Sequence, residues 1–165
     1  MDPASTLTIS GAIGVCDPAT VDPDLGGADP DVIVADCDGT WTIGTVVTDL
    51  GRSGPRASRL IAERAGAEMA GEPVNVGSVS VDSGHAMICG LSDARAGRID
   101  AEAVAEAMDA AGPTAARVPG VEAVCCLSGM GDGSYDVLVS HESGSGNPAR
   151  IEVVFLTEKR SRRRL

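Results

Sequence analysis

Two similar Asp-Gly segments constrain the fold of this chain more than any other feature. Residues 38–41 (Asp-Gly-Thr-Trp) align with residues 132–135 (Asp-Gly-Ser-Tyr) at an offset of 94 positions. An earlier pair of segments, residues 10–16 and 83–89, aligns at an offset of 73 and matches Ser, Gly and Cys. The two offsets differ by 21 residues. The sequence therefore predicts a duplicated unit with an insertion in its second copy.

The repeated units consist of strands. Short runs of apolar residues, bounded by Gly, Pro, Asp and Ser, are typical of strands. They occupy residues 7–9, 12–16, 32–35, 41–48, 74–81, 86–91, 121–127, 135–140 and 151–156. Two β units that cannot cover their own apolar faces would share one core, as a sandwich or a barrel. We expect a mainly β fold (β-dominated α+β), with residues 1–158 forming one compact domain from repeats at about 6–70 and 74–158.

One helix is expected, and it lies inside the insertion. Residues Asp100–Ala111 begin with a capping aspartate, stop before Gly112-Pro113 and place Val104 and Met108 on one face. Residues 56–70 are ambiguous, because their composition favours a helix whereas the repeat favours a strand at 58–62. Residues 17–31 are expected to be a loop, because the residue before a proline is pushed out of the α region.

The Asp-Gly steps predict tight turns, because Gly readily adopts a positive φ. We interpret both steps as hairpin corners. The aromatic residue that follows each corner would anchor an equivalent strand. The turn residues are Asp38, Gly39, Trp41, Asp132, Gly133 and Tyr135.

The second half resembles a family of small bacterial proteins known as a domain of unknown function. The segments that carry the resemblance are Val81–Gly84 (Val-Asp-Ser-Gly) and Gly131–Val137 (Gly-Asp-Gly-Ser-Tyr-Asp-Val), and it covers about residues 79–155. One departure is Cys89–Leu91, which stands where the family has Asp-Pro; Asp17-Pro18 follows the equivalent cysteine of the first half instead. The resemblance implies a small β-rich fold and supplies no activity.

Charge is strongly segregated along the chain. The last seven residues carry five positive charges, while the preceding 158 residues carry 24 acidic and 8 basic side chains, a formal charge of −16. An acidic body of this kind repels nucleic acid and anionic membranes, so contact with nucleic acid is expected only through the basic tail at 159–165. The candidate binding residues are Arg160, Arg162, Arg163 and Arg164.

The cysteines and the hydropathy pattern indicate a cytoplasmic protein, or one carried in a large assembly. Five cysteines are an odd number, and the N-terminus has no basic segment followed by a continuous apolar run. No stretch approaches the roughly 18 apolar residues that a membrane-spanning helix needs. We therefore expect reduced, mostly buried thiols, no membrane partner and no cofactor.

A small hydrolase is one alternative function. His85 or His141 would act with Cys89, Asp82 or Asp132, because nucleophilic catalysis needs a base beside a thiol or hydroxyl. The chain has no Gly-x-Ser-x-Gly elbow between a strand and a helix. Surface or capping roles for both histidines are therefore the favoured interpretation.

A metal-stabilised module is the other alternative. The candidate oxygen ligands for a calcium ion are Asp22, Asp24, Asp29 and Asp31. Their spacing does not match an EF-hand loop, and the prolines between them favour a stiff, solvated loop. The cysteines lack the Cys-x-x-Cys spacing of structural zinc sites.

These observations together predict a non-enzymatic binding or assembly protein of bacterial or phage-like origin that acts through protein–protein contacts. Catalytic groups are few, the β unit is duplicated, and the body and tail are oppositely charged. The basic tail of one copy would meet the Asp-rich loop at residues 17–31 of another, so we expect a protein partner or self-association.

Overall fold

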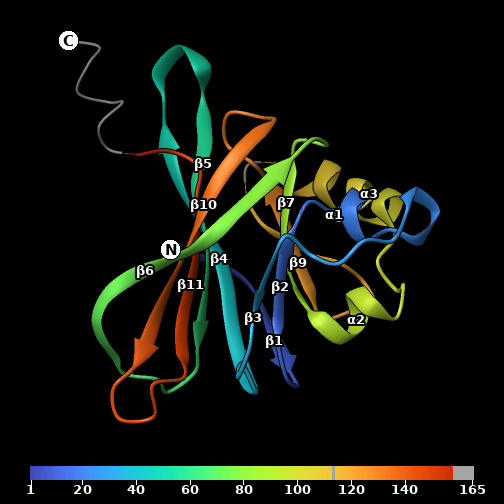
Figure 1. Cartoon of the computed structure of the whole chain (residues 1–165). Helices are drawn as coiled ribbons and strands as arrows, with labels where there is room; N and C mark the ends of the chain where they lie inside the picture. The colour runs from blue at the N-terminus through green and yellow to red at the C-terminus, as the bar shows by residue number, and fades with distance from the viewer. Residues whose placement is uncertain (113, 158–165) are drawn as a thin grey trace.

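The computed structural model describes residues 1–112 and 114–157, which form two packed antiparallel sheets with helices beside one of them (Figure 1). The six-stranded sheet has the order β1 (Asp2–Ile9), β4 (Gly39–Asp49), β5 (Pro55–Arg64), β11 (Pro148–Val154), β10 (Gly133–Glu142), β6 (Met69–Val81). The five-stranded sheet has the order β3 (Val32–Val34), β2 (Ile13–Cys16), β7 (His85–Gly90), β9 (Ala123–Leu127), β8 (Ala116–Arg117). The architecture is a sandwich, which is one of the two forms predicted from the sequence.

The strand order has internal twofold symmetry. Reading the six-stranded sheet from either edge gives β1, β4, β5 from the first half of the chain and β6, β10, β11 from the second half. In the five-stranded sheet, β3 and β2 match β9 and β7, and β8 is the one strand without a counterpart. The duplicated β unit predicted from the sequence is therefore confirmed in the topology.

The symmetry axis passes between Val15 on β2 and Ile88 on β7. These residues lie directly opposite each other in the antiparallel ladder. They are also equivalent positions at the 73-residue offset, and in an antiparallel pair of equivalent strands such a residue pair marks the twofold axis. Because β2 pairs with β7 and β5 pairs with β11, the repeats are joined by backbone hydrogen bonds within both sheets as well as by packing between the sheets.

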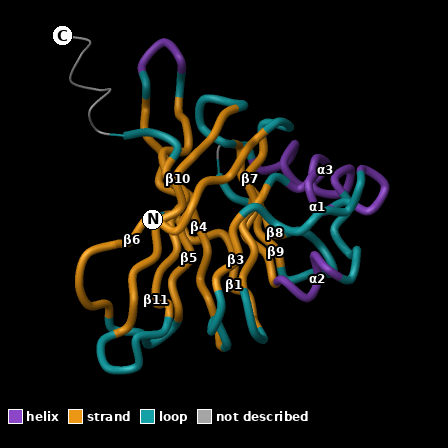
Figure 2. Tube along the Cα trace, in the orientation of Figure 1, coloured by secondary structure: helices purple, strands orange, loops and turns teal. Residues whose placement is uncertain are grey.

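The apolar residues form two layers, one on each side of the five-stranded sheet. Strand side chains alternate between faces, so Ile13, Val15 and Ile88 enter the core between the sheets, whereas Met87 and Cys89 face the other way. The second layer packs under α1 (Pro18–Val21), α2 (Leu91–Arg95) and α3 (Ala101–Ala111), which lie together beside this sheet (Figure 2). The three inner strands of this sheet, β2, β7 and β9, are buried on both faces, which explains their almost uninterrupted apolar sequences.

The inserted helix is confirmed as α3. The Asp100 side chain accepts a hydrogen bond from the Glu102 amide at 2.9 Å, and Val104 and Met108 are its buried residues. The helix lies between β7 and β9, where the insertion was predicted. The ambiguous residues 56–70 are resolved in favour of the repeat, because residues 55–64 form β5.

The prediction of a loop without helix at residues 17–31 was wrong. Two short helices occur there, α1 and the 3₁₀ helix η1 (Pro23–Leu25), and each begins with Pro at its first position. An extended residue before proline is what an N-cap requires, and Asp17 and Asp22 are both extended caps whose side chains accept from the new helix. Two of the three Asp-Pro steps of this segment, Asp17-Pro18 and Asp22-Pro23, therefore start helices.

The prediction of hairpins at the Asp-Gly corners was also wrong. Asp38-Gly39 joins β3 to β4, and Asp132-Gly133 joins β9 to β10, so each corner carries the chain from one sheet to the other. Gly39 has a φ of 131°, a value that residues with a β-carbon rarely adopt. The true hairpins are elsewhere, and the one between β4 and β5 turns through the 3₁₀ helix η2 (Gly51–Ser53).

Candidate functional site

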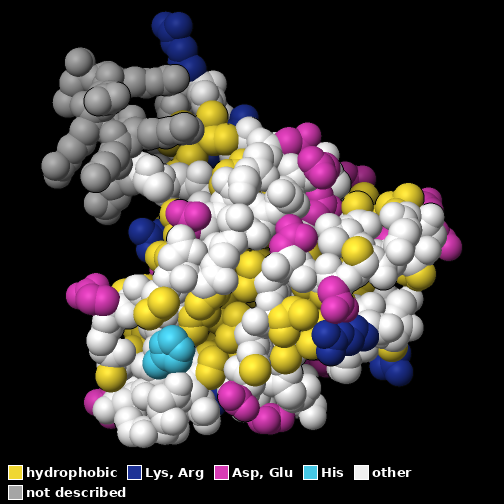
Figure 3. Space-filling view, in the orientation of Figure 1, with side chains coloured by type: hydrophobic (Ala, Val, Ile, Leu, Met, Phe, Trp, Pro, Cys, Tyr) yellow, Lys and Arg dark blue, Asp and Glu magenta, His cyan; other side chains and the backbone are white. Residues whose placement is uncertain are grey.

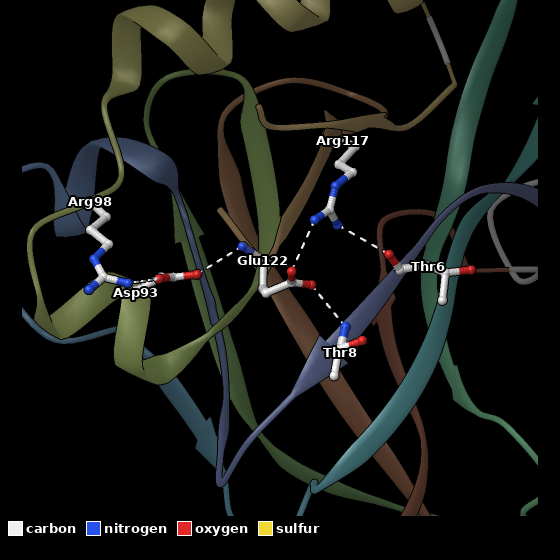
Figure 4. Close-up of polar contacts among 6 residues, drawn as sticks. All are labelled: Thr6, Thr8, Asp93, Arg98, Arg117 and Glu122. Atoms are coloured by element: carbon white, nitrogen blue, oxygen red, sulfur yellow. Dashed lines mark hydrogen bonds and ion pairs between the residues drawn. The ribbon is translucent and has the colours of Figure 1, made fainter. Parts of the chain in front are cut away.

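The two edges of the six-stranded sheet differ in how they are closed. At the β1 edge, the Thr6 carbonyl and the Thr8 amide point away from β4. Arg117 donates to the Thr6 carbonyl at 3.1 Å, and the Glu122 carboxylate accepts from the Thr8 amide at 2.8 Å (Figure 4). One guanidinium and one carboxylate therefore replace the donor and acceptor of a missing neighbouring strand.

This Arg117–Glu122 cap is held in place by further contacts. The two side chains form an ion pair at 3.1 Å, and the Glu122 amide donates to Asp93 at 2.8 Å. Asp93 is buried and pairs with Arg98 at 3.1 Å (Figure 4). Charged side chains at a sheet edge prevent other strands from adding to it, so β1 is a blocked edge.

The β6 edge has one half of an equivalent cap. Thr6 and Thr8 lie opposite Thr42 and Thr40 on β4, and Ser78 and Ser80 lie opposite Asp136 and Ser134 on β10. At the 94-residue offset these partners coincide, so Ser78 corresponds to Thr6 and Ser80 to Thr8. The Ser80 amide donates to the Asp31 carboxylate at 2.7 Å, as Thr8 donates to Glu122.

The arginine of the cap has no counterpart at β6. The Ser78 carbonyl, which corresponds to that of Thr6, accepts from no side chain in the part of the chain that the structure describes. Ser78 is exposed, and Asp31 is exposed as well. The β6 edge therefore presents an outward carbonyl beside an outward carboxylate, with the cation missing.

Beyond Ser78 the β6 edge is exposed and apolar. All residues from 69 to 78 are exposed, and Met69, Val74 and Val76 retain 48%, 51% and 44% of their surface. Hydrophobic side chains gather on the face of the molecule along which β6 runs (Figure 3). The expectation of a half-buried strand at 74–81 holds only for Val79 and Val81, because the five-stranded sheet covers only that end of β6.

The shape of β6 restricts what can pair with it. Register shifts relative to β10 occur between Val137 and Leu138 and between Val139 and His141, and Pro73 lacks an amide donor. Bulges and prolines protect edge strands from indiscriminate pairing. The regular stretch at the Ser78 end is therefore the part of this edge best suited to a specific contact.

Acidic side chains surround that end of the edge. Asp136 lies opposite Ser78, and the pairing of Gly133 with Val81 brings Asp132 and Asp82 to the end of the same ladder. All three carboxylates are exposed and belong to none of the ion pairs of the described residues. The local potential is negative, so this edge attracts cations.

The hydrolase alternative placed His85 near an acid or thiol. In the structure, the His85 Nδ1 atom lies 3.5 Å from the Ser83 hydroxyl, which donates to buried Asp17 at 2.7 Å. A hydrolytic triad needs the histidine between the hydroxyl and the carboxylate, whereas here the hydroxyl is in the middle. Asp17 also accepts from the amides of Asp82, Ser83 and Ala19, so it pins the β6–β7 turn to α1.

The other proposed catalytic residues are not brought together. Cys89 lies four positions after His85 on β7, about 13 Å along the strand, and its buried thiol points to the Gly14 carbonyl at 3.6 Å. His141 is half-buried on β10, opposite Pro148 and Ala70. Within residues 1–112 and 114–157, no hydrogen bond joins either histidine to Asp82, Asp132 or Cys89.

All five cysteines are free and buried. The thiols of Cys16 and Cys89, which are equivalent in the two repeats, hydrogen bond to each other, and this contact together with burial raises the pKa of Cys16 well above its ordinary value. Burial raises the pKa of Cys37 to about 11 and raises those of Cys125 and Cys126 well above their ordinary value. Protonated, shielded thiols are poor nucleophiles.

Three of the four aspartates proposed as calcium ligands serve separate structural roles. Asp22 is buried and accepts from the amides of Asp24 and Ala101, which links η1 to the start of α3. Asp29 pairs with Arg95, whose guanidinium lowers the pKa of that carboxyl, and Asp31 caps β6. No group of three or more potential metal ligands occurs among the residues that the structure describes.

Sequence reasoning missed the residues that form the two edges. Arg117 and Glu122 contact backbone atoms of β1 more than 100 positions away, and no local pattern indicates such a contact. The available signal was the repeat, because Asp31 and Glu122 each stand directly before an equivalent strand, β3 and β9. The proposed binding residues Arg160, Arg162, Arg163 and Arg164 lie outside the described residues.

Comparison with family models, with curated proteins and with solved structures finds no match to this chain. The resemblance to a bacterial domain of unknown function stays a prediction. Within the described residues, no helix is long and apolar enough to cross a membrane.

Proposed function

We propose that this chain is a non-enzymatic assembly protein of bacterial or phage-like origin, whose copies bind one another through the β6 edge. The observation that carries the proposal is the difference between the two equivalent edges. A guanidinium and a carboxylate close β1, whereas β6 is exposed from residue 69 to residue 78. Five free cysteines support a reducing compartment, so we place the protein in the cytoplasm or within a large assembly.

Both the backbone and the side chains of β6 suit a protein partner. An edge strand offers unpaired amides and carbonyls that an added segment can satisfy, and side chains beside it give specificity. Burying the exposed halves of Val74 and Val76 would stabilise the contact by about 1 kcal/mol each. The body charge of −16 opposes the approach of two copies, so the basic tail supplies the attraction.

Sedimentation of a β6 variant tests the proposal. We expect the wild-type chain to exceed the monomer mass of 16.6 kDa at micromolar concentrations. Val76→Lys should sediment as a monomer, because a charge would be buried in the contact. Leu25→Lys is the matched control, because Leu25 is an exposed apolar residue in η1, 63% exposed and remote from β6 in the chain.

The control variant should assemble as the wild type does. A wild-type chain that stays monomeric at every concentration would contradict the proposal. Equal assembly of the wild type and Val76→Lys would contradict it as well, since the contact would then lie on another surface.

A further inference from the structure

The internal symmetry shows what the β6 edge lacks. At β1 the cap has two parts: the Glu122 carboxylate accepts from the Thr8 amide, and the Arg117 guanidinium bridges Glu122 and the Thr6 carbonyl at 3.1 Å each. At β6 the Asp31 carboxylate accepts from the Ser80 amide at 2.7 Å. The Ser78 carbonyl and the second oxygen of Asp31 stand where the guanidinium would bind.

We propose that an arginine from the C-terminal segment of a second copy completes this half-cap. The inference rests on the proposed function and names the group that β6 recognises. The candidates are Arg160, Arg162, Arg163 and Arg164. The guanidinium donates to the Ser78 carbonyl and pairs with the Asp31 carboxylate, as Arg117 does in the complete cap.

Arginine fits this position better than lysine. A planar guanidinium carries five donors in a fixed arrangement and can bridge two acceptors, whereas an ammonium is a compact point charge. The exposed carboxylates of Asp82, Asp132 and Asp136 around the edge add long-range attraction for a segment with five cations in seven residues. Neither feature favours a neutral or acidic partner.

The point where the described chain ends supports the tail as the occupant. Thr157 lines a shallow cavity of about 230 Å³ together with Ser134, Tyr135 and Asp136 of β10. Asp136 lies opposite Ser78, and β10 separates β6 from β11, the strand after which the tail leaves the body. The eight residues after Thr157 span at most about 26–29 Å when extended. Because the tail and its docking point are close, two copies can exchange tails reciprocally around a twofold axis.

A second copy would cover more of the exposed β6 edge than the chain's own tail would. The exposed residues Val74 and Val76 continue directly from Ser78 along β6. A tail folded back onto its own chain would satisfy Ser78 and leave these side chains in water. A neighbouring copy covers both, so the half-cap and the apolar stretch form one continuous interface.

Peptide binding tests the inference. The probe is a synthetic peptide of residues 158–165, titrated calorimetrically into a chain that ends at Thr157, at low salt. Asp31→Asn keeps an oxygen acceptor for the Ser80 amide but removes the charge, and we expect at least about tenfold weaker binding, since a hydrogen bond to a charged acceptor is stronger than one to a neutral acceptor. Glu122→Gln makes the same change at the closed β1 edge and should leave the affinity unchanged.

A second series keeps the test independent of whether the Asp31 variant folds. A peptide with its four arginines replaced by lysine has the same charge and should bind several-fold more weakly. Equal affinity of the two peptides, or equal weakening by Asp31→Asn and Glu122→Gln, would overturn the inference. If Val76→Lys abolishes assembly but the peptide does not bind, the result supports assembly through β6 and contradicts the arginine cap.

The source of the tail is tested in the full-length chain. The Ser78 and Ser80 amide chemical shifts should differ from those of the truncated chain at high concentration and approach them on dilution. Shifts that stay perturbed in the dilute monomer would show the tail on its own chain and would overturn the assignment to a second copy.

Discussion

The Trp41 indole N–H and the Tyr135 hydroxyl donate equivalent hydrogen bonds in the two repeats. Trp41 donates to the Cys37 carbonyl and Tyr135 to the Gly131 carbonyl, both at 2.7 Å and both four residues earlier in the chain. Each bond closes the corner at which the chain crosses from one sheet to the other. The two aromatic residues therefore hold the corners as well as the strands that follow them.

The equivalence extends to the group that lies against each ring. The Arg64 guanidinium lies 5.2 Å from the Trp41 ring centre, and the Phe155 ring lies 5.2 Å from that of Tyr135 in an edge-to-face arrangement. Arg64 pairs with Trp41 across β4 and β5, and Phe155 follows β11 at the matching position. The position beside the aromatic ring is occupied by a guanidinium in the first repeat and by a phenyl ring in the second. A cation packs favourably over the face of an aromatic ring, and a second ring packs favourably edge-to-face against it.

Removing the hydroxyl of Tyr135 should destabilise the fold modestly. Tyr135→Phe leaves the Gly131 carbonyl without this donor, and we expect a loss of about 1 kcal/mol in the free energy of unfolding. Trp41→Phe should cost about 3 kcal/mol, because it also leaves a cavity around a fully buried residue. Urea unfolding followed by circular dichroism measures both values. An unchanged midpoint for Tyr135→Phe would show that the hydrogen bond does not stabilise the corner.

The repeat made much of this fold predictable, because strands and the α3 helix each leave a local pattern. The crossing at Asp38-Gly39 was not predictable, since an Asp-Gly step specifies a turn and says nothing about which sheet receives the next strand. Helix α2 was also missed. Its cap is Gly90, which has no side chain to signal a helix start, although the 73-residue offset maps Pro18 of α1 onto Leu91 of α2.

The candidate site was predicted less well than the fold. Asp31 was identified as an acidic residue, but its role depends on the Ser80 amide, 49 positions away. Side-chain contacts to distant backbone atoms follow from strand order, and strand order is not visible in a single sequence. The exposure of Val74 and Val76 has the same origin, because it depends on how far the second sheet extends over the first.

Asp17 should be among the most sensitive positions in the chain. Its buried carboxylate accepts hydrogen bonds from three amides and the Ser83 hydroxyl, and it joins the two repeats. Asp17→Ala leaves these donors unpaired and should lower the free energy of unfolding by about 3 kcal/mol or more. Ser83→Ala removes one of the four bonds and should cost about 1 kcal/mol. Denaturant unfolding measures both variants. Equal losses of unfolding free energy in Asp17→Ala and Ser83→Ala would contradict the role of Asp17 as the shared acceptor.

Stability should fall in alkaline solution because of the buried thiols. Burial raises the pKa of Cys37 from 9.0 to about 11, and it raises the pKa values of Cys125 and Cys126 as well. Above about pH 9 the unfolded chain loses thiol protons that the folded chain keeps, so the unfolded state gains stability as the pH rises. The loss from Cys37 should begin near pH 9 and level off above pH 11.

Unfolding free energies at pH 7.5 and at about pH 10 measure this dependence. Cys37→Ala should reduce this pH dependence only in part, because it removes one buried thiol and leaves those of Cys125 and Cys126. A wild-type chain with the same stability at both pH values would show that the thiols ionise freely in the folded state.

Sedimentation equilibrium of the full chain and of a chain ending at Thr157 tests the central claim most directly. We predict that the full chain is larger than a monomer at about 0.15 M salt, that its mass falls as salt increasingly screens the tail, and that the truncated chain is a monomer under the same conditions. The same oligomeric state for both chains, whether monomer or larger, would contradict assembly of β6 edges by the basic tail.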